Sequence, residues 1–139
     1  MSTALADTMW TQGTKMAGMS FAKPDVLAKL DTMSKAELDK LPFGTVKVDD
    51  AGVIKEYNKY ESQLANVTQA AAMGKNFFTQ LAPCTNNAVF YGNFKKGVAA
   101  KAYNLMFVYT FSYNMTPTPV RIHLHRTPAG SNWILVEKK

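Results

Sequence analysis

The sequence is poor in thiols, imidazoles and long apolar runs. Its 139 residues include one cysteine and two histidines. One cysteine cannot form an internal disulfide, which is compatible with a reducing compartment. No stretch approaches the ~20 apolar residues that span a bilayer, and no basic segment followed by an apolar one marks a secretory signal near the N-terminus. We therefore expect a cytoplasmic protein without membrane partners.

Charge is also scarce, and it is unevenly distributed. Charged residues make up 19% of the chain, and the net charge is +6. Residues 1–43 contain five Lys against five Asp or Glu, whereas residues 44–139 contain eleven Lys or Arg against five acids. No run of basic residues is longer than two, so the sequence favours a solvated basic surface and predicts no nucleic-acid partner.

The two histidines, His123 and His125, alternate with apolar residues and share one face of a predicted strand. A pair of imidazoles can bind a metal ion, but no third Cys or His lies nearby in the sequence. The sequence therefore predicts solvent-facing histidines and no metal site.

Periodicity predicts a helical N-terminus followed by a sheet. Residues 1–24 show no sustained hydrophobic period and predict a loosely structured arm. Residues 25–41 predict two short helices, the second with a capping box at Ser34 and Glu37. Beyond them the patterns predict a hairpin at 45–57, short helices and loops at 58–86, an amphipathic helix at 90–101, and strands at 103–113, 120–125 and 133–136.

This order of elements predicts an α+β fold in a single domain. We expect a five-stranded antiparallel sheet, a helical crossover on one face, and an N-terminal helical cap. The predicted boundaries are an arm and cap at residues 1–43 and a core at residues 44–139. The arrangement resembles that of PAS domains, which are sensory modules with a small-ligand pocket, although a fold does not settle a function.

Tyr57, Glu61 and Cys84 are the most informative residues. A Tyr and a Glu four residues apart share a face if 57–61 is a helical turn, and a lone thiol offers a covalent anchor. Together they can hold a small aromatic acid and tune its charge. Taken separately, the lone Cys is most often a small buried hydrophobe, and the pair is a solvated helix face if Tyr57 ends a strand.

Six blocks of sequence carry a resemblance to the photoactive yellow protein family. The resemblance covers roughly residues 25–139, and the spacing of the blocks matches the family without a gap from Gly44 to Met115. The blocks are LPFG at 41–44, EYN at 56–58, GKNFF at 74–78, APCT at 82–85, FYG at 90–92 and MFVYTFSYNMTPT at 106–118.

The resemblance implies a p-coumaric acid chromophore, attached to Cys84 as a 4-hydroxycinnamoyl thioester. It implies that Tyr57 and a protonated Glu61 donate hydrogen bonds to the chromophore phenolate. Further pocket positions implied by the resemblance are Phe77, Pro83, Tyr109, Phe111 and Met115. Two more pocket positions depart from the family, because Ala65 stands where a Thr usually supports the Tyr hydroxyl and Val67 stands where an Arg usually lies.

The implied function is that of a blue-light photoreceptor rather than an enzyme. Light would isomerise the chromophore from trans to cis, Glu61 would give its proton to the phenolate, and the buried carboxylate left behind would open the N-terminal cap as the signal. The expected partner is a downstream signalling protein that the sequence does not identify, and the chain itself is expected to be a monomer or weak dimer.

Two other functions stay open at this point. Ala65 and Val67 are the features that favour a chromophore-free PAS-type module, which would bind a small ligand or a protein. A thiol-dependent acyl-transfer enzyme is the third hypothesis, and it requires a base close to Cys84.

Overall fold

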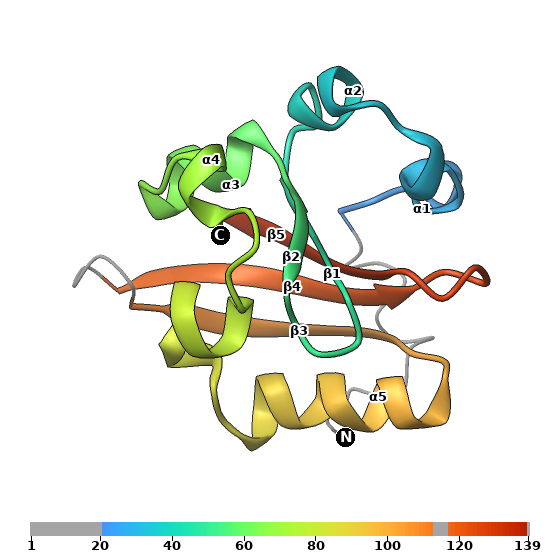
Figure 1. Ribbon diagram of the computed structural model, residues 1–139, viewed down its shortest axis with the longest axis vertical. Helices are drawn as coiled ribbons and strands as arrows, with labels where there is room; N and C mark the ends of the chain where they lie inside the picture. The colour runs from blue at the N-terminus through green and yellow to red at the C-terminus, as the bar shows by residue number, and fades with distance from the viewer. Residues whose placement is uncertain (1–20, 113–116, 139) are drawn as a thin grey trace.

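The computed structural model describes residues 21–112 and 117–138, which form one sheet with helical segments around it (Figure 1). The strands are β1 (Gly44–Val48), β2 (Ile54–Tyr57), β3 (Asn104–Phe111), β4 (Thr118–Arg126) and β5 (Asn132–Lys138). The helical segments are α1 (Pro24–Lys29), η3 (Leu30–Thr32), α2 (Lys35–Asp39), α3 (Lys59–Ala65), α4 (Gln69–Ala72), η4 (Phe77–Leu81), η5 (Pro83–Thr85), η6 (Ala88–Gly92) and α5 (Asn93–Ala100).

The five strands form a single antiparallel sheet in the order β2-β1-β5-β4-β3. Strand β5 comes last along the chain but lies in the middle, where it pairs with β1 on one side and β4 on the other. Strands β3 and β4 pair without interruption from Asn104↔His125 to Phe111↔Thr118. The predicted α+β, PAS-like fold is therefore confirmed.

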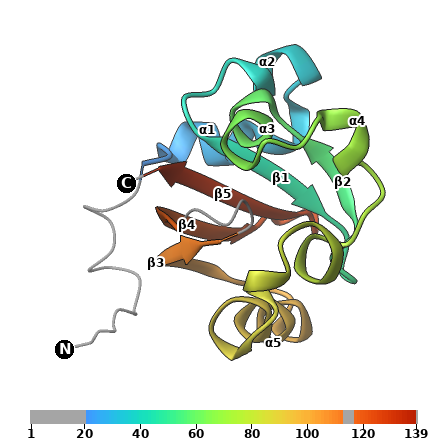
Figure 2. The ribbon, with the colours of Figure 1, turned by 90° about the vertical axis from the view of Figure 1, so that its left-hand side faces the viewer.

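Residues along β5 alternate between two hydrophobic clusters, one on each face of the sheet. Figure 2 shows α5 on one side of the sheet and α1 and α2 on the other. The outer cluster, beneath the cap, consists of Ala22, Leu30, Leu38, Phe43, Trp133 and Leu135. The inner cluster, beneath the crossover, consists of Val46, Val48, Ile54, Tyr57, Ala72, Phe77, Phe78, Leu81, Ala82, Phe90, Phe94, Phe111, Val120, Ile122, Leu124, Ile134 and Val136.

Local sequence signals fix the start of two helical segments. Glu37 N donates to Ser34 Oγ over 3.2 Å and Ser34 N donates to the Glu37 carboxylate over 2.8 Å, so the predicted capping box is confirmed. The predicted single helix at 90–101 differs, because it begins with the π-helical turn η6 and continues as α5. Asn87 starts η6 by accepting a hydrogen bond from Phe90 N over 3.0 Å.

The histidines of β4 do not face open solvent as the sequence predicts. His123 is only 1% exposed, and His125 is half-buried. Both side chains point away from the inner cluster, because their neighbours Ile122 and Leu124 belong to it. The cap covers that opposite face of the sheet (Figure 2), so polar residues there are still enclosed.

Candidate functional site

Tyr57 and Glu61 lie together at the junction between β2 and α3. Tyr57 ends the strand, so residues 57–61 are not one helical turn. The chain turns at Asn58, and the Tyr57 hydroxyl donates to the main-chain carbonyl of Glu61 over 3.5 Å. Tyr57 is 3% exposed and Glu61 is 0% exposed. The interpretation of this pair as a solvated helix face is therefore wrong.

The environment of Tyr57 keeps its hydroxyl protonated. Burial raises the pKa of Tyr57 well above its ordinary value, and the negative charge of an ionised Glu61 raises that pKa further. Tyr57 is consequently a neutral hydrogen-bond donor at neutral pH.

Asn58 joins this pair to the cap through a buried side-chain amide. Its Nδ2 donates to the carbonyls of Leu38 (2.8 Å) and Phe43 (2.9 Å). Its Oδ1 accepts from the main-chain N–H groups of Thr45 (3.0 Å) and Glu61 (3.2 Å). Asn58 is thus the N-cap of α3 and also a direct link between Glu61 and residues 38–45. Sequence reasoning used Asn58 only as part of a family block and missed this role.

Two small residues leave room around the Glu61 side chain and the end of α3. A Cβ added at Gly44 would collide with the Glu61 carboxyl group, so only glycine fits opposite it. Ala65 is fully buried as the last residue of α3. The helix then ends at Asn66, whose left-handed conformation (φ 57°) turns the chain toward Val67.

Cys84 lies in the short η5 turn between two π-helical turns, and its side chain is partly buried against the inner cluster. Its main-chain carbonyl accepts hydrogen bonds from the Tyr109 hydroxyl (2.6 Å) and from Asn87 Nδ2 (3.2 Å). Asn87 Nδ2 also donates to the Tyr109 hydroxyl oxygen. These contacts tie the Cys84 loop to β3. The only sequence signal for this role of Asn87 is the general preference of asparagine for helix N-caps.

Most of the predicted pocket residues belong to the inner cluster or pack against it. Val67, Cys84 and Tyr109 pack against the inner cluster, to which Tyr57, Phe77 and Phe111 belong. Phe90 stands at the centre of this group, with ring centroids 5.1 Å from Tyr109 and 6.0 Å from Phe77. The sequence indicated Phe90 as part of an amphipathic helix and of a family block, but not as a pocket residue.

The remaining predicted positions are less directly placed. Pro83 is exposed and begins the η5 turn ahead of Cys84. Met115 lies outside the described residues. Val67 presents an apolar side chain where the resemblance leads one to expect Arg. The two arginines of β4 are engaged in ion pairs: Arg121 pairs with Glu137 (2.9 Å) and Arg126 pairs with Asp50 (2.9 Å).

The described part of the chain contains neither a cluster of metal ligands nor a membrane-spanning helix. Within it, no three His, Cys, Asp or Glu side chains are grouped so that they could hold a metal ion. Among the same residues, no helix has the length and apolar character that crossing a membrane requires.

Two curated relatives match nearly the whole chain. The photoactive yellow protein of Rhodothalassium salexigens is 39% identical over 124 residues, which cover 88% of this chain and 99% of the relative. That of Halochromatium salexigens is 37% identical over 119 residues, which cover 85% and 95%. No family model matches the chain.

Solved structures agree in fold. The photoactive yellow protein domain of the sensor histidine kinase Ppr from Rhodospirillum centenum is 38% identical, with a TM-score of 0.77 over 81% of this chain and 99% of that domain. A domain of a sensor histidine kinase/response regulator from Geobacter sulfurreducens has a TM-score of 0.62 at 12% identity, over 85% of this chain and 99% of that domain, and supports the fold alone. The identity and coverage of the curated relatives show that this chain belongs to the photoactive yellow protein family.

Proposed function

We propose that this protein is a blue-light photoreceptor that carries a p-coumaroyl group as a thioester on Cys84. One observation carries the proposal: the fully buried Glu61 contacts Tyr57, and Tyr57 belongs to the same inner cluster against which Cys84, the single thiol, packs. A fully buried acid, a neutral phenol and a partly exposed thiol fit a ligand that is acidic at one end and acylated at the other.

The thiol of Cys84 has a defined task in loading the group. Its thiolate attacks the carbonyl carbon of an activated p-coumaric ester, so that a sulfur–carbon bond replaces the bond to the leaving group, which departs with the thiol proton. The hydrogen bonds from Tyr109 and Asn87 to the Cys84 carbonyl hold the loop in place. Once bound, the group supplies blue-light absorption and trans–cis isomerisation.

Tyr57 and Glu61 would hold the ring oxygen in its ionised form. A phenolate buried without partners is unfavourable by several kcal/mol, and strong donors to it offset that cost. Tyr57 is such a donor because burial keeps it protonated. Glu61 can be the second donor as a neutral acid, since it is 0% exposed and burial disfavours the charged form of a carboxyl group.

The same residues suggest how the signal leaves the site. After illumination Glu61 would give up its proton, and the resulting buried carboxylate would disturb the start of α3. Asn58 bonds both Glu61 N and the carbonyls of Leu38 and Phe43, so the disturbance would reach the cap directly. We propose that residues 1–43 act as arm and cap and loosen, while the core at residues 44–139 persists.

Reconstitution tests the chromophore. Purified apoprotein is mixed with an activated p-coumaric ester, and the expected product is yellow, bleaches reversibly in blue light, and carries one acyl group on Cys84 by mass spectrometry. The Cys84→Ala variant should stay colourless. A colourless wild-type protein, or an adduct that does not respond to light, would contradict the proposal.

Hydrogen exchange tests the signalling step separately. In the loaded protein, amide exchange in residues 25–43 should rise under continuous illumination, while exchange in β4 and β5 stays slow. Equal exchange in light and dark would refute cap release without refuting the photoreceptor itself.

The alternatives make distinct predictions in the reconstitution experiment. A chromophore-free module, favoured by Ala65 and Val67, would give no stable adduct. An acyl-transfer enzyme would turn the ester over, but it needs a base, and both histidines of the chain lie on the face of the sheet opposite the inner cluster. The geometry therefore favours a stable thioester.

We further propose a cytoplasmic location and a downstream signalling protein as the partner. The solved photoactive yellow protein domain from a sensor histidine kinase supports this, because there such a domain is built into a signalling protein. No nucleic-acid or membrane partner is proposed, and the chain is expected to be a monomer or weak dimer.

A further inference from the structure

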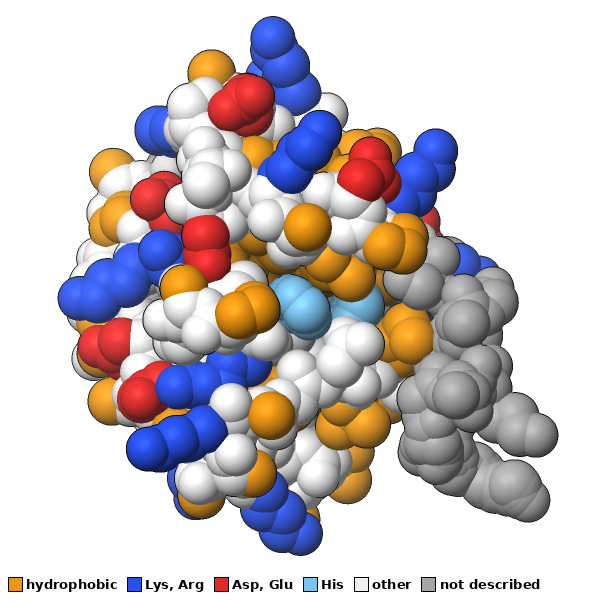
Figure 3. Space-filling model, turned by 90° about the vertical axis from the view of Figure 1, so that its right-hand side faces the viewer, with side chains coloured by type: hydrophobic (Ala, Val, Ile, Leu, Met, Phe, Trp, Pro, Cys, Tyr) orange, Lys and Arg blue, Asp and Glu red, His pale blue; other side chains and the backbone are white. Residues whose placement is uncertain are grey.

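The outer face of the sheet carries an imidazole pair that the proposed photochemistry does not use. His123 and His125 project from the same face of β4, with ring centroids 5.8 Å apart. His123 Nε2 and His125 Nδ1 both contact one atom, Asn104 Oδ1, at the start of β3; the His125 contact is 3.3 Å. The two ring nitrogens therefore converge on a single point. Figure 3 shows the histidine side chains, in pale blue, in a hollow of the molecular surface.

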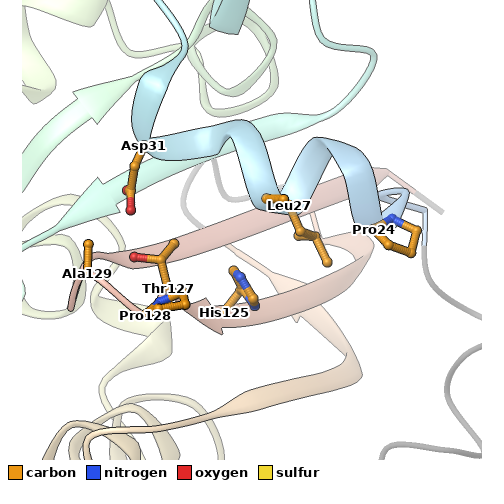
Figure 4. Close-up of a pocket in the computed structure, with 8 residues that line it drawn as sticks. Pro24, Leu27, Asp31, His125, Thr127, Pro128 and Ala129 are labelled. Atoms are coloured by element: carbon orange, nitrogen blue, oxygen red, sulfur yellow. The ribbon is translucent and has the colours of Figure 1, made fainter.

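A cavity of about 480 Å³ borders His125, one of the two imidazoles. It lies between α1 and the end of β4, and its wall includes His125, Leu27 and Asp31. Figure 4 shows His125 directed from β4 toward the helix, with Asp31 on the opposite wall. The Asp31 carboxylate is negatively charged: although burial disfavours the charge, hydrogen bonds from Thr127 and Trp133 lower the pKa of Asp31 below its ordinary value. The cavity thus favours a cation.

Both imidazoles are held in the form that metals require. Burial, together with the proximity of His125, lowers the pKa of His123 to about 4. Burial lowers the pKa of His125 as well, although the charge of Asp31 opposes that shift. Neutral imidazole is a good ligand for Zn²⁺, Ni²⁺ and Cu²⁺. His123 Nδ1 is buried and has no hydrogen-bond partner among the described residues, so no second contact fixes which ring nitrogen carries the proton.

We propose that His123 and His125 form a two-imidazole binding site for a divalent first-row transition metal ion. Asn104 is exposed, so its side chain can rotate away from the point where the two nitrogens meet. A cation that takes the place of the amide oxygen gains both nitrogens and completes its coordination with water. With two strong ligands the site is open and exchangeable, and it prefers Cu²⁺ over Ni²⁺.

The composition of the chain makes the test sharp. The protein contains only two histidines and one cysteine, so a full-length chain prepared without an affinity tag and with Cys84→Ala has no other imidazole or thiol. Calorimetric titration with Cu²⁺, and then with Zn²⁺ and Mg²⁺, should give one Cu²⁺ per chain, weaker Zn²⁺ binding and no Mg²⁺ binding. The electron paramagnetic resonance spectrum of the Cu²⁺ form should show coupling to two imidazole nitrogens.

Variants separate this site from adventitious binding. His125→Gln, at the half-buried position, should weaken Cu²⁺ binding by at least about tenfold, the scale on which loss of a supporting ligand acts, and His123→Gln should do the same. Because His123→Gln can perturb the fold, ring-nitrogen NMR of the unaltered chain with Zn²⁺ is the second readout, and both histidines should shift together. Absence of Cu²⁺ binding, equal affinity in the His123→Gln/His125→Gln double variant, or a response of one ring only would overturn the proposal.

Discussion

Replacing Asn58 with alanine would remove four buried hydrogen bonds at once. The amide donates to two carbonyls of residues 38–43 and accepts from two main-chain N–H groups at the starts of β1 and α3. Each such bond contributes about 1 kcal/mol net, and partners left unsatisfied in the interior add to the loss. We therefore expect Asn58→Ala to lower the free energy of unfolding by about 3–5 kcal/mol, a large share of the ~5–15 kcal/mol typical of a domain.

Urea unfolding of the apoprotein measures this loss in a Trp10→Phe background, so that tryptophan fluorescence reports Trp133, whose ring is buried beneath the cap. Thr68→Ala is the matched control, since Thr68 also caps a helix through its side chain but is exposed, and it should lose only about 1 kcal/mol. If Asn58→Ala loses no more than the control, the reasoning that Asn58 joins cap and core is wrong.

Three other predictions follow from the site and the outer face. Burial lowers the pKa of His123 to about 4, against ~6.5 in the unfolded chain, so between these pH values the unfolded state binds a proton that the folded state does not. The free energy of unfolding should therefore fall as the pH drops from about 6.5 to about 4. His123→Gln should flatten this acidic part of a plot of urea midpoint against pH. An unchanged slope in that part would contradict the assignment. The Ala65→Thr, Val67→Arg double substitution should shift the absorption maximum and the dark recovery rate of the reconstituted protein, and identical spectra and rates would place these residues outside the pocket. Gly44→Ala should lower the free energy of unfolding by about 1–3 kcal/mol and shift the spectrum, because the added methyl group meets the Glu61 carboxyl group; a neutral outcome in chemical denaturation would show that Glu61 lies elsewhere.

Features fixed by neighbouring residues could be predicted from the sequence. The capping box needs only Ser34 and Glu37, three residues apart, and it forms as predicted. Strands β3 and β4 could be predicted because large apolar residues alternate with smaller or polar ones, and β5 because a short apolar run follows a turn. The place of Tyr57 in the inner cluster and of Cys84 against it was predictable only through the family resemblance, because the two residues lie 27 positions apart.

Features that depend on residues distant in the sequence could not be predicted. The burial of His123 requires the cap, which is built some 80 residues earlier in the chain, so alternation alone misread its surroundings. The four bonds of Asn58 reach residues 3, 13, 15 and 20 positions away, and three of those partners are not local. The Tyr57–Glu61 contact was predicted for the wrong reason, since a strand end followed by a turn, rather than a helix, brings the two together.

The central place of β5 has a consequence for how the chain reaches its native state. The strand that pairs with both β1 and β4 is the last of the five to be synthesised. Until it emerges from the ribosome, β1–β2 and β3–β4 are separate hairpins, and joining Gly44 to Val136 closes a loop of nearly the whole domain. The nascent chain must therefore keep both hairpins from aggregating until β5 has been synthesised.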